Sequence, residues 1–131
     1  MTWMPLKDYQ REAVEQLGDY CQAVRDAVAR EAHRPERDAY EQQTGRDYYT
    51  TPNFEGVPYV CLRIPTGGGK TLMAAHAIGE IGRKLLGIDR PACLWITPST
   101  TIRDQTLRGL QNVHHPYRKA LQESLASDVE V

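Results

Sequence analysis

A lysine and a threonine follow a glycine run near the middle of this chain of 131 residues, in the stretch RIPTGGGKT from Arg63 to Thr71. Because glycines have no Cβ atom, the backbone at 67–69 can curl until successive N–H groups point into one concavity. The unpaired N–H groups of a following helix would join them, and a polyphosphate fits there. Lys70 would reach the outer phosphates as a point charge, and the Thr71 hydroxyl would ligate a bridging Mg²⁺ ion.

The stretch therefore predicts a nucleoside triphosphate site. Its expected residues are Thr66, Gly67, Gly68, Gly69, Lys70 and Thr71. The strict pattern G-x-x-x-x-G-K-[ST] requires glycine at position 64, where this chain has Ile64. The shorter core T-G-x-G-K-T is present and resembles the loop of superfamily 2 helicases, in which the first glycine is commonly replaced. The alternative is a surface loop that contains a lysine, and the strand and helix expected on either side favour the phosphate loop.

An aromatic residue followed by glutamine lies upstream, in the stretch LKDYQREAV, and it too resembles a superfamily 2 element, the one that recognises adenine. A glutamine amide offers a donor and an acceptor, which match the N6 and N7 edge of adenine, whereas guanine presents acceptors at both places. Gln10 is therefore expected to select ATP over GTP, and Tyr9 is expected beside it in the nucleotide site. The alternative places Tyr9 in a helix core and Gln10 on a solvated helix face.

A hydroxyl cluster follows the apolar run in the stretch LWITPSTTIRDQT. Thr101 and Asp104 form an imperfect capping box, and the start of a helix exposes unpaired N–H groups that suit a nucleic-acid phosphate without reading its sequence. This stretch resembles the helicase motif P-T-x-x-L-x-x-Q. A plain capped helix is the alternative. The residues expected at the phosphate are Pro98, Ser99, Thr100, Thr101 and Arg103.

Taken in order, the three stretches resemble the first RecA-like motor domain of a superfamily 2 helicase. The last of them, with HHPYRKAL after it, resembles the type III restriction enzyme ATPase subunit and its DEAD/DEAH-box relatives. The resemblance implies ATP and Mg²⁺ as cofactors, a catalytic role for Lys70, and a helicase or translocase acting on nucleic acid, with DNA expected. For the restriction subunit of a type III system it implies a modification methyltransferase as partner.

The elements that would position these residues are predicted from periodicity. Apolar residues at a helical spacing predict helices over 6–33, loosened at Gly18, and over 70–86, 101–112 and 117–126. Short apolar runs predict strands over 59–64 and 92–97. Alternating strands and helices indicate an α/β fold, a partial RecA-like P-loop domain with a parallel sheet flanked by helices and a leading N-terminal helix. One domain over 1–131 is expected, with 34–58 as an extended loop or insertion.

An ATP-driven motor also needs an aspartate–glutamate pair at the end of a further strand, the Walker B motif. No such pair follows Gln105, since Asp128 and Glu130 come late and are separated by a valine. We therefore expect the N-terminal part of a motor, without its downstream domains and with little hydrolysis of its own. A P-loop kinase and a non-catalytic nucleotide-binding module remain as alternatives.

Composition limits the remaining possibilities. The formal net charge of −1 gives no overall field that attracts nucleic acid or membrane, so a nucleic-acid site must be local. No apolar run approaches the ~20 residues of a spanning helix, and the N-terminus lacks a signal-peptide pattern, so a soluble, cytoplasmic protein is expected. Cys61 and Cys93 lie in apolar runs and are expected to be buried. The four histidines lack metal-ligand spacing and are expected at the surface.

Overall fold

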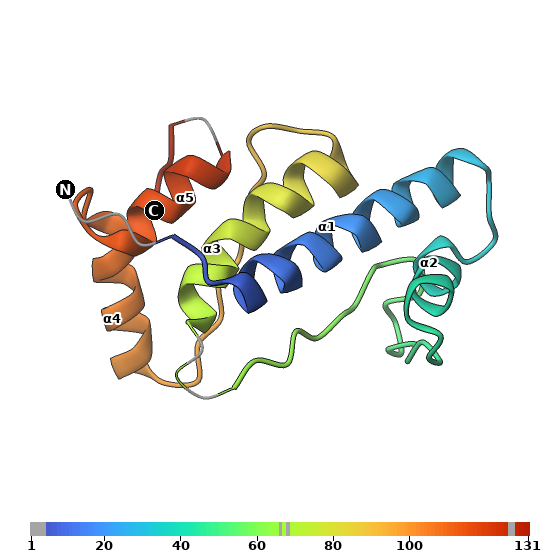
Figure 1. Cartoon of the computed structure of the whole chain (residues 1–131), viewed down its shortest axis with the longest axis horizontal. Helices are drawn as coiled ribbons and strands as arrows, with labels where there is room; N and C mark the ends of the chain where they lie inside the picture. Colours follow the sequence, from blue (N-terminus) through green and yellow to red (C-terminus); the bar gives the residue numbers. More distant parts are fainter. Residues whose placement is uncertain (1–4, 66, 68, 126–127) are drawn as a thin grey trace.

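The computed structural model describes residues 5–65, 67, 69–125 and 128–131, and its regular elements are helices (Figure 1). A long helix crosses the molecule, with one short helix near its C-terminal end and the remaining helices on the other side. In chain order the helices are α1 (Asp8–Ala29), α2 (Pro35–Thr44), α3 (Lys70–Glu80), the π-helical segment η1 (Ile81–Leu86), α4 (Thr100–Gln111) and α5 (Pro116–Leu125).

Helix α1 confirms the first predicted helix, with ends a few residues shorter. It buries Val14, Leu17 and Val24 at a helical spacing, as the apolar pattern predicts. The expected loosening at Gly18 is wrong, because α1 is continuous there. A Cβ at Gly18 would lie 2.2 Å from Oε2 of Glu80, so the glycine allows the end of α3 to approach α1 closely.

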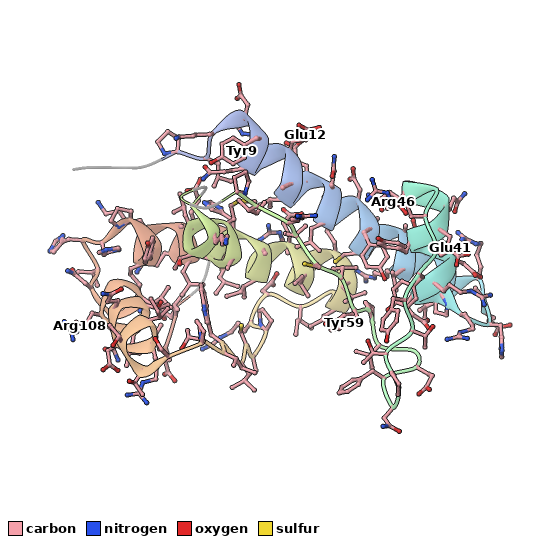
Figure 2. All side chains as sticks on the ribbon, turned by 90° about the horizontal axis from the view of Figure 1, so that it is seen from below. Tyr9, Glu12, Glu41, Arg46, Tyr59 and Arg108 are labelled. Atoms are coloured by element: carbon pink, nitrogen blue, oxygen red, sulfur yellow. The ribbon has the colours of Figure 1, made fainter. Side chains whose placement is uncertain are left out.

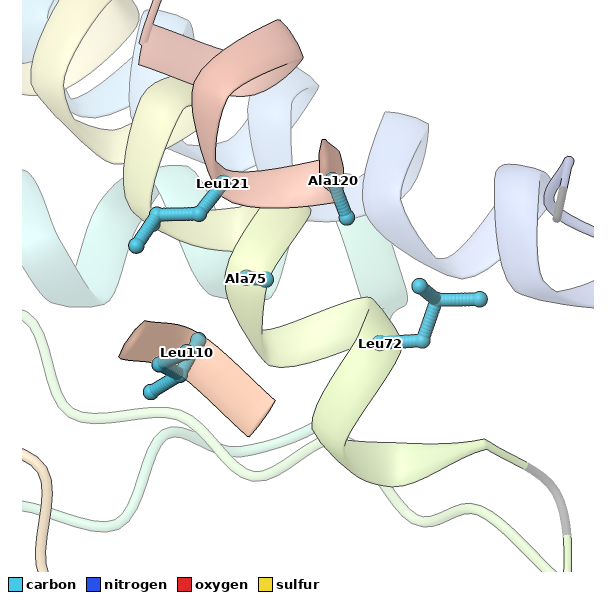
Figure 3. Packing of buried hydrophobic residues seen from close by; sticks show 5 residues of the cluster. All are labelled: Leu72, Ala75, Leu110, Ala120 and Leu121. Carbon is cyan, nitrogen blue, oxygen red and sulfur yellow. The ribbon is translucent and has the colours of Figure 1, made fainter. Parts of the chain in front are cut away.

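Helix α3 lies between α1 and α5, and the main core forms where α3, α4 and α5 meet (Figures 1 and 3). Leu72 and Ala75 come from α3, Leu110 from α4, and Ala120 and Leu121 from α5; all five are buried. Trp95 packs against this core. Helices α3 and α5 are in close contact, and α4 and α5 confirm the two predicted C-terminal helices to within one residue at each end.

The predicted α/β fold is wrong, because no strand or sheet occurs in the described part of the chain. The two segments expected as strands, 59–64 and 92–97, lack regular secondary structure, and they expose large apolar side chains: Tyr59, Val60, Leu62, Leu94 and Ile96. A strand requires hydrogen bonds from a neighbouring strand, and no described segment pairs with either run. The two runs have the residue types of buried strands, but residue types alone do not supply a neighbouring strand to pair with.

Three smaller expectations also change. The segment 34–58 is not all extended loop, because it contains α2, which packs on α1 and begins with Pro35 at its first position, where proline is favourable. Cys61 and Cys93 are exposed, because the segments that carry them are not covered by a second layer. The predicted helix 70–86 is confirmed over its whole length, but its last turns, η1, adopt π-helical geometry and end at Gly87 with φ +66°.

Candidate nucleotide and phosphate sites

Two of the three glycines in the run, Gly67 and Gly69, bend the chain just before α3. Gly67 and Gly69 have φ of +77° and +78°, in the left-handed region that L-residues with side chains rarely adopt. Gly69 is the N-cap of α3, and its carbonyl accepts a hydrogen bond from the Met73 N–H at 3.0 Å. Thr66 and Gly68, also expected in the loop, lie outside the described residues. The described glycines therefore bend the chain directly into the start of α3.

The start of α3 has an electrostatic preference for an anion. Its first turn carries no acidic residue, and no side chain among the described residues caps it. By contrast, α1 begins with Asp8, and α2 carries Glu36 and Asp38 in its first turn. Lys70 is exposed at the first position of α3, where a cation is unfavourable beside the positive end of the helix dipole. A bound phosphate would neutralise both charges. Thr71 follows and is partly buried.

Gln10 lies against this loop, although a long stretch of sequence separates the two. A Cβ placed on Gly69 would be 2.3 Å from Nε2 of Gln10, so the amide and the loop backbone are in contact. Gln10 is 4% exposed, and its Oε1 accepts a hydrogen bond from the Lys7 N–H at 2.8 Å, which caps the start of α1. The alternative interpretation of Gln10, as a solvated helix residue, does not fit this burial. Tyr9 is 41% exposed, at the start of α1 beside the start of α3 (Figure 2).

The second expected phosphate site lies at the start of α4, which begins at the same lower edge of the molecule as α3 (Figure 1). The expected capping box of Thr101 and Asp104 is wrong, because α4 starts one residue earlier and Ser99 is its N-cap. The Ser99 hydroxyl accepts a hydrogen bond from the Ile102 N–H at 3.3 Å. The N–H groups of Thr100 and Thr101 come before that bond in the first turn, where helices leave donors for an external acceptor.

All five residues expected at this second site are exposed: Pro98, Ser99, Thr100, Thr101 and Arg103. Arg103 already has an acidic neighbour, since its Nη2 lies 2.9 Å from Oδ1 of Asp104. The pair is solvent-exposed, so it constrains the guanidinium weakly. The start of α4 thus offers helix donors, hydroxyl groups and one arginine, with a carboxylate competing for that arginine.

Histidine chemistry contributes little to either site. His33 and His114 are exposed as predicted, whereas His76 in α3 and His115 are partly buried. Burial lowers the pKa of His76, and the nearby Glu123 and Glu80 oppose that shift. Within the described residues no group of three His, Cys, Asp or Glu side chains could hold a metal ion, and no helix has the length and apolar character to cross a membrane.

A comparison with protein-family models decides the family. The model of the type III restriction enzyme, res subunit, matches residues 3–130, which is nearly the whole chain. The chain belongs to the type III restriction enzyme Res-subunit family. This confirms the resemblance inferred from the three sequence stretches. No curated protein and no solved structure matches the chain.

The family match identifies a helicase superfamily 2 N-terminal domain over these residues, which is a helicase-like ATPase domain. Such domains generally use ATP with Mg²⁺, and the family context suggests interaction with nucleic acid. Sequence reasoning missed two features of the Res-subunit chain. Gln10 caps the start of α1, and its position three residues after Lys7 was the signal in the sequence that could have shown this. Ser99, and not Thr101, caps the start of α4.

Proposed function

We propose that this chain binds ATP with Mg²⁺ at the start of α3 and serves as the nucleotide-binding part of a nucleic-acid-dependent ATPase motor. The contact between the Gln10 amide and Gly69 carries the proposal, because it joins the residue expected to recognise adenine to the loop expected to hold the phosphates. Gly67, Gly69 and Lys70 would cradle the triphosphate, with Thr66 and Gly68 beside them, and Thr71 would ligate the Mg²⁺ ion. Tyr9 would flank the adenine ring.

The nucleic acid in this proposal is DNA, held by its phosphates at the start of α4. The hydroxyl groups and free helix N–H groups there bind phosphate without reading base sequence. A helicase or translocase role follows, as does a place beside a methyltransferase subunit in a restriction system. A P-loop kinase would use the same loop, but it gives no reason for the exposed hydroxyl cluster at Ser99–Thr101 or for Arg103 next to it.

The direct test is the variant Lys70→Ala. Lys70 is exposed in the loop, so its removal should leave the helices intact while most of the affinity for ATP·Mg²⁺ is lost, since the lysine acts through its charge. Calorimetric titration with ATP measures the affinity, and circular dichroism measures the helix content.

Lys84→Ala is the matched control. Lys84 lies in η1, further along the same helical run, and its ammonium pairs with Glu80 at 3.4 Å. Removing it changes the net charge as Lys70→Ala does, but far from the loop, so ATP affinity should stay close to that of the unmodified chain. Equal ATP binding by Lys70→Ala and the unmodified chain would overturn the nucleotide assignment.

A further inference from the structure

Three tyrosines connect α1, α2 and the loop that follows α2. The rings of Tyr20 and Tyr40 have centroids 6.1 Å apart, and those of Tyr40 and Tyr48 are 5.5 Å apart, both edge to face. We call Tyr20, Tyr40 and Tyr48 the tyrosine clamp. Tyr20 is buried on α1, the helix that also carries Gln10, and its hydroxyl donates to the backbone carbonyl of Glu36 at 2.9 Å. The clamp therefore fixes the position of Tyr48 relative to α1.

The Tyr48 hydroxyl holds the backbone where the chain leaves this loop. It accepts a hydrogen bond from the Tyr59 N–H at 2.9 Å and donates to the Val57 carbonyl at 3.4 Å. Beside it, the buried Glu36 carboxylate accepts a hydrogen bond from the Gly56 N–H at 3.1 Å through Oε1. Three positions within 56–59 are thus tied to α2 and the clamp.

The next segment, residues 60–65, runs from this tied point to the phosphate loop. Figure 2 shows Tyr59 where the chain turns towards the start of α3. Val60 and Leu62 line a cavity of about 220 Å³ together with Leu17 of α1, so side chains leave space between the segment and that helix. The segment is therefore hydrogen-bonded just before its start and continues into α3 at its end.

We propose that Tyr48 is a positioning residue for the phosphate loop, acting through its hydrogen bonds to the backbone at Val57 and Tyr59. This inference rests on the proposed ATP site. With its start fixed, the segment 60–65 has fewer conformations to lose when a triphosphate binds at the start of α3. Without the Tyr48 hydroxyl, the start of this segment would have to be fixed when ATP binds, and the affinity for ATP would fall.

Tyr48→Phe tests this directly, because it removes only the hydroxyl oxygen and keeps the ring that packs on Tyr40. The dissociation constant for ATP·Mg²⁺ should rise about fivefold, as expected for the loss of one to two hydrogen bonds. Tyr49→Phe is the matched control, because Tyr49 is the next residue and is 76% exposed. The affinity of this variant for ATP·Mg²⁺ should match that of the unmodified chain.

Amide hydrogen exchange separates positioning from a general loss of structure. In free Tyr48→Phe, exchange at the Tyr59 N–H should become faster, because this N–H loses its acceptor, while the N–H groups of α1 and α3 keep their protection. Tyr59→Pro removes the same hydrogen bond from the donor side, and it should weaken ATP binding to a similar degree.

The outcomes of these experiments distinguish the positioning role of Tyr48 from the proposed ATP site. If the unmodified chain fails to bind ATP, the proposed function is wrong. If the unmodified chain binds ATP and Tyr48→Phe binds it equally well, the positioning role is wrong and the ATP site stands. If exchange rises throughout α1 and α3, Tyr48 supports the fold in general, and the positioning role is also wrong.

Discussion

The Gln10 amide is shared between two neighbours, since Oε1 accepts the Lys7 N–H and Nε2 lies against Gly69. A ligand that pairs with this amide would therefore meet a side chain whose orientation is already set by the helix cap. Two features favour glycine at position 69: its positive φ, which side chains rarely allow, and the Gln10 amide, which a Cβ would have to displace.

We predict that Gln10→Ala narrows the preference for ATP over GTP by ~1–3 kcal/mol, the value of one or two hydrogen bonds. Competition binding with the two nucleotides measures it. The variant should also lose some stability, because the Lys7 N–H loses its acceptor. Gln22→Ala, an exposed glutamine on the same helix, is the control and should leave the preference alone. A ratio unchanged in Gln10→Ala would restrict Gln10 to its capping role.

Helices α3 and α5 cross at a glycine and a serine. The Ser124 hydroxyl accepts a hydrogen bond from the Gly79 N–H at 3.0 Å and donates to the His76 carbonyl at 2.8 Å. A Cβ at Gly79 would lie 2.1 Å from the Ser124 hydroxyl oxygen and 2.2 Å from its backbone carbonyl oxygen. Because backbone cannot move aside as a flexible side chain does, the two helices can pack at this distance only with glycine at position 79.

At the scale of the element, Gly79→Ala should lower the free energy of unfolding by ~1–3 kcal/mol through overpacking, even though alanine favours a helix more than glycine does. Denaturant unfolding followed by circular dichroism checks this. Ser124→Ala offers a comparison at the same crossing, because it removes the bridging hydroxyl without adding an atom and should cost about 1 kcal/mol. A Gly79→Ala variant as stable as the unmodified chain would show that the helices separate without penalty.

Across the whole molecule, charge is nearly balanced, so attraction to nucleic acid depends on local sites such as the start of α4. Its helix donors and hydroxyl groups are exposed, while Asp104 competes with a phosphate for Arg103. Binding there should consequently be weak, with a shallow salt dependence set by the single charged contact that Arg103 can make to a phosphate.

We predict that Thr100→Ala combined with Arg103→Ala weakens single-stranded DNA binding regardless of base sequence and makes the salt slope shallower by roughly one unit. ATP binding should persist. Filter binding over a salt series, with ATP titration beside it, measures both. Asp104→Asn should act in the opposite direction, because it removes the carboxylate that pairs with Arg103. Equal DNA affinity of the double variant and the unmodified chain at every salt concentration would exclude α4 as the phosphate site and favour the kinase alternative.

Local patterns in the sequence determined the positions of the helices and of the glycine bend that enters α3. The apolar spacing within α1, α3, α4 and α5 depends on residues three or four positions apart, so it is visible without knowledge of the fold. Glycines followed by lysine and threonine likewise predicted a sharp bend entering a helix, and Gly67 and Gly69 adopt it. The family resemblance rested on the same short stretches and is confirmed.

Tertiary structure alone decided the features that depend on distant partners. The apolar runs at 59–64 and 92–97 have strand-like composition, but without a neighbouring strand among the described residues their side chains remain exposed. The segment 34–58 folds into α2 and a tied loop because Tyr20 and Glu36 bring α1 and α2 together. Gln10 reaches Gly69 only because α1 and α3 pack side by side. Local spacing records which residues an element contains, whereas hydrogen-bond partners and close approaches depend on contacts between parts of the chain that are far apart in sequence.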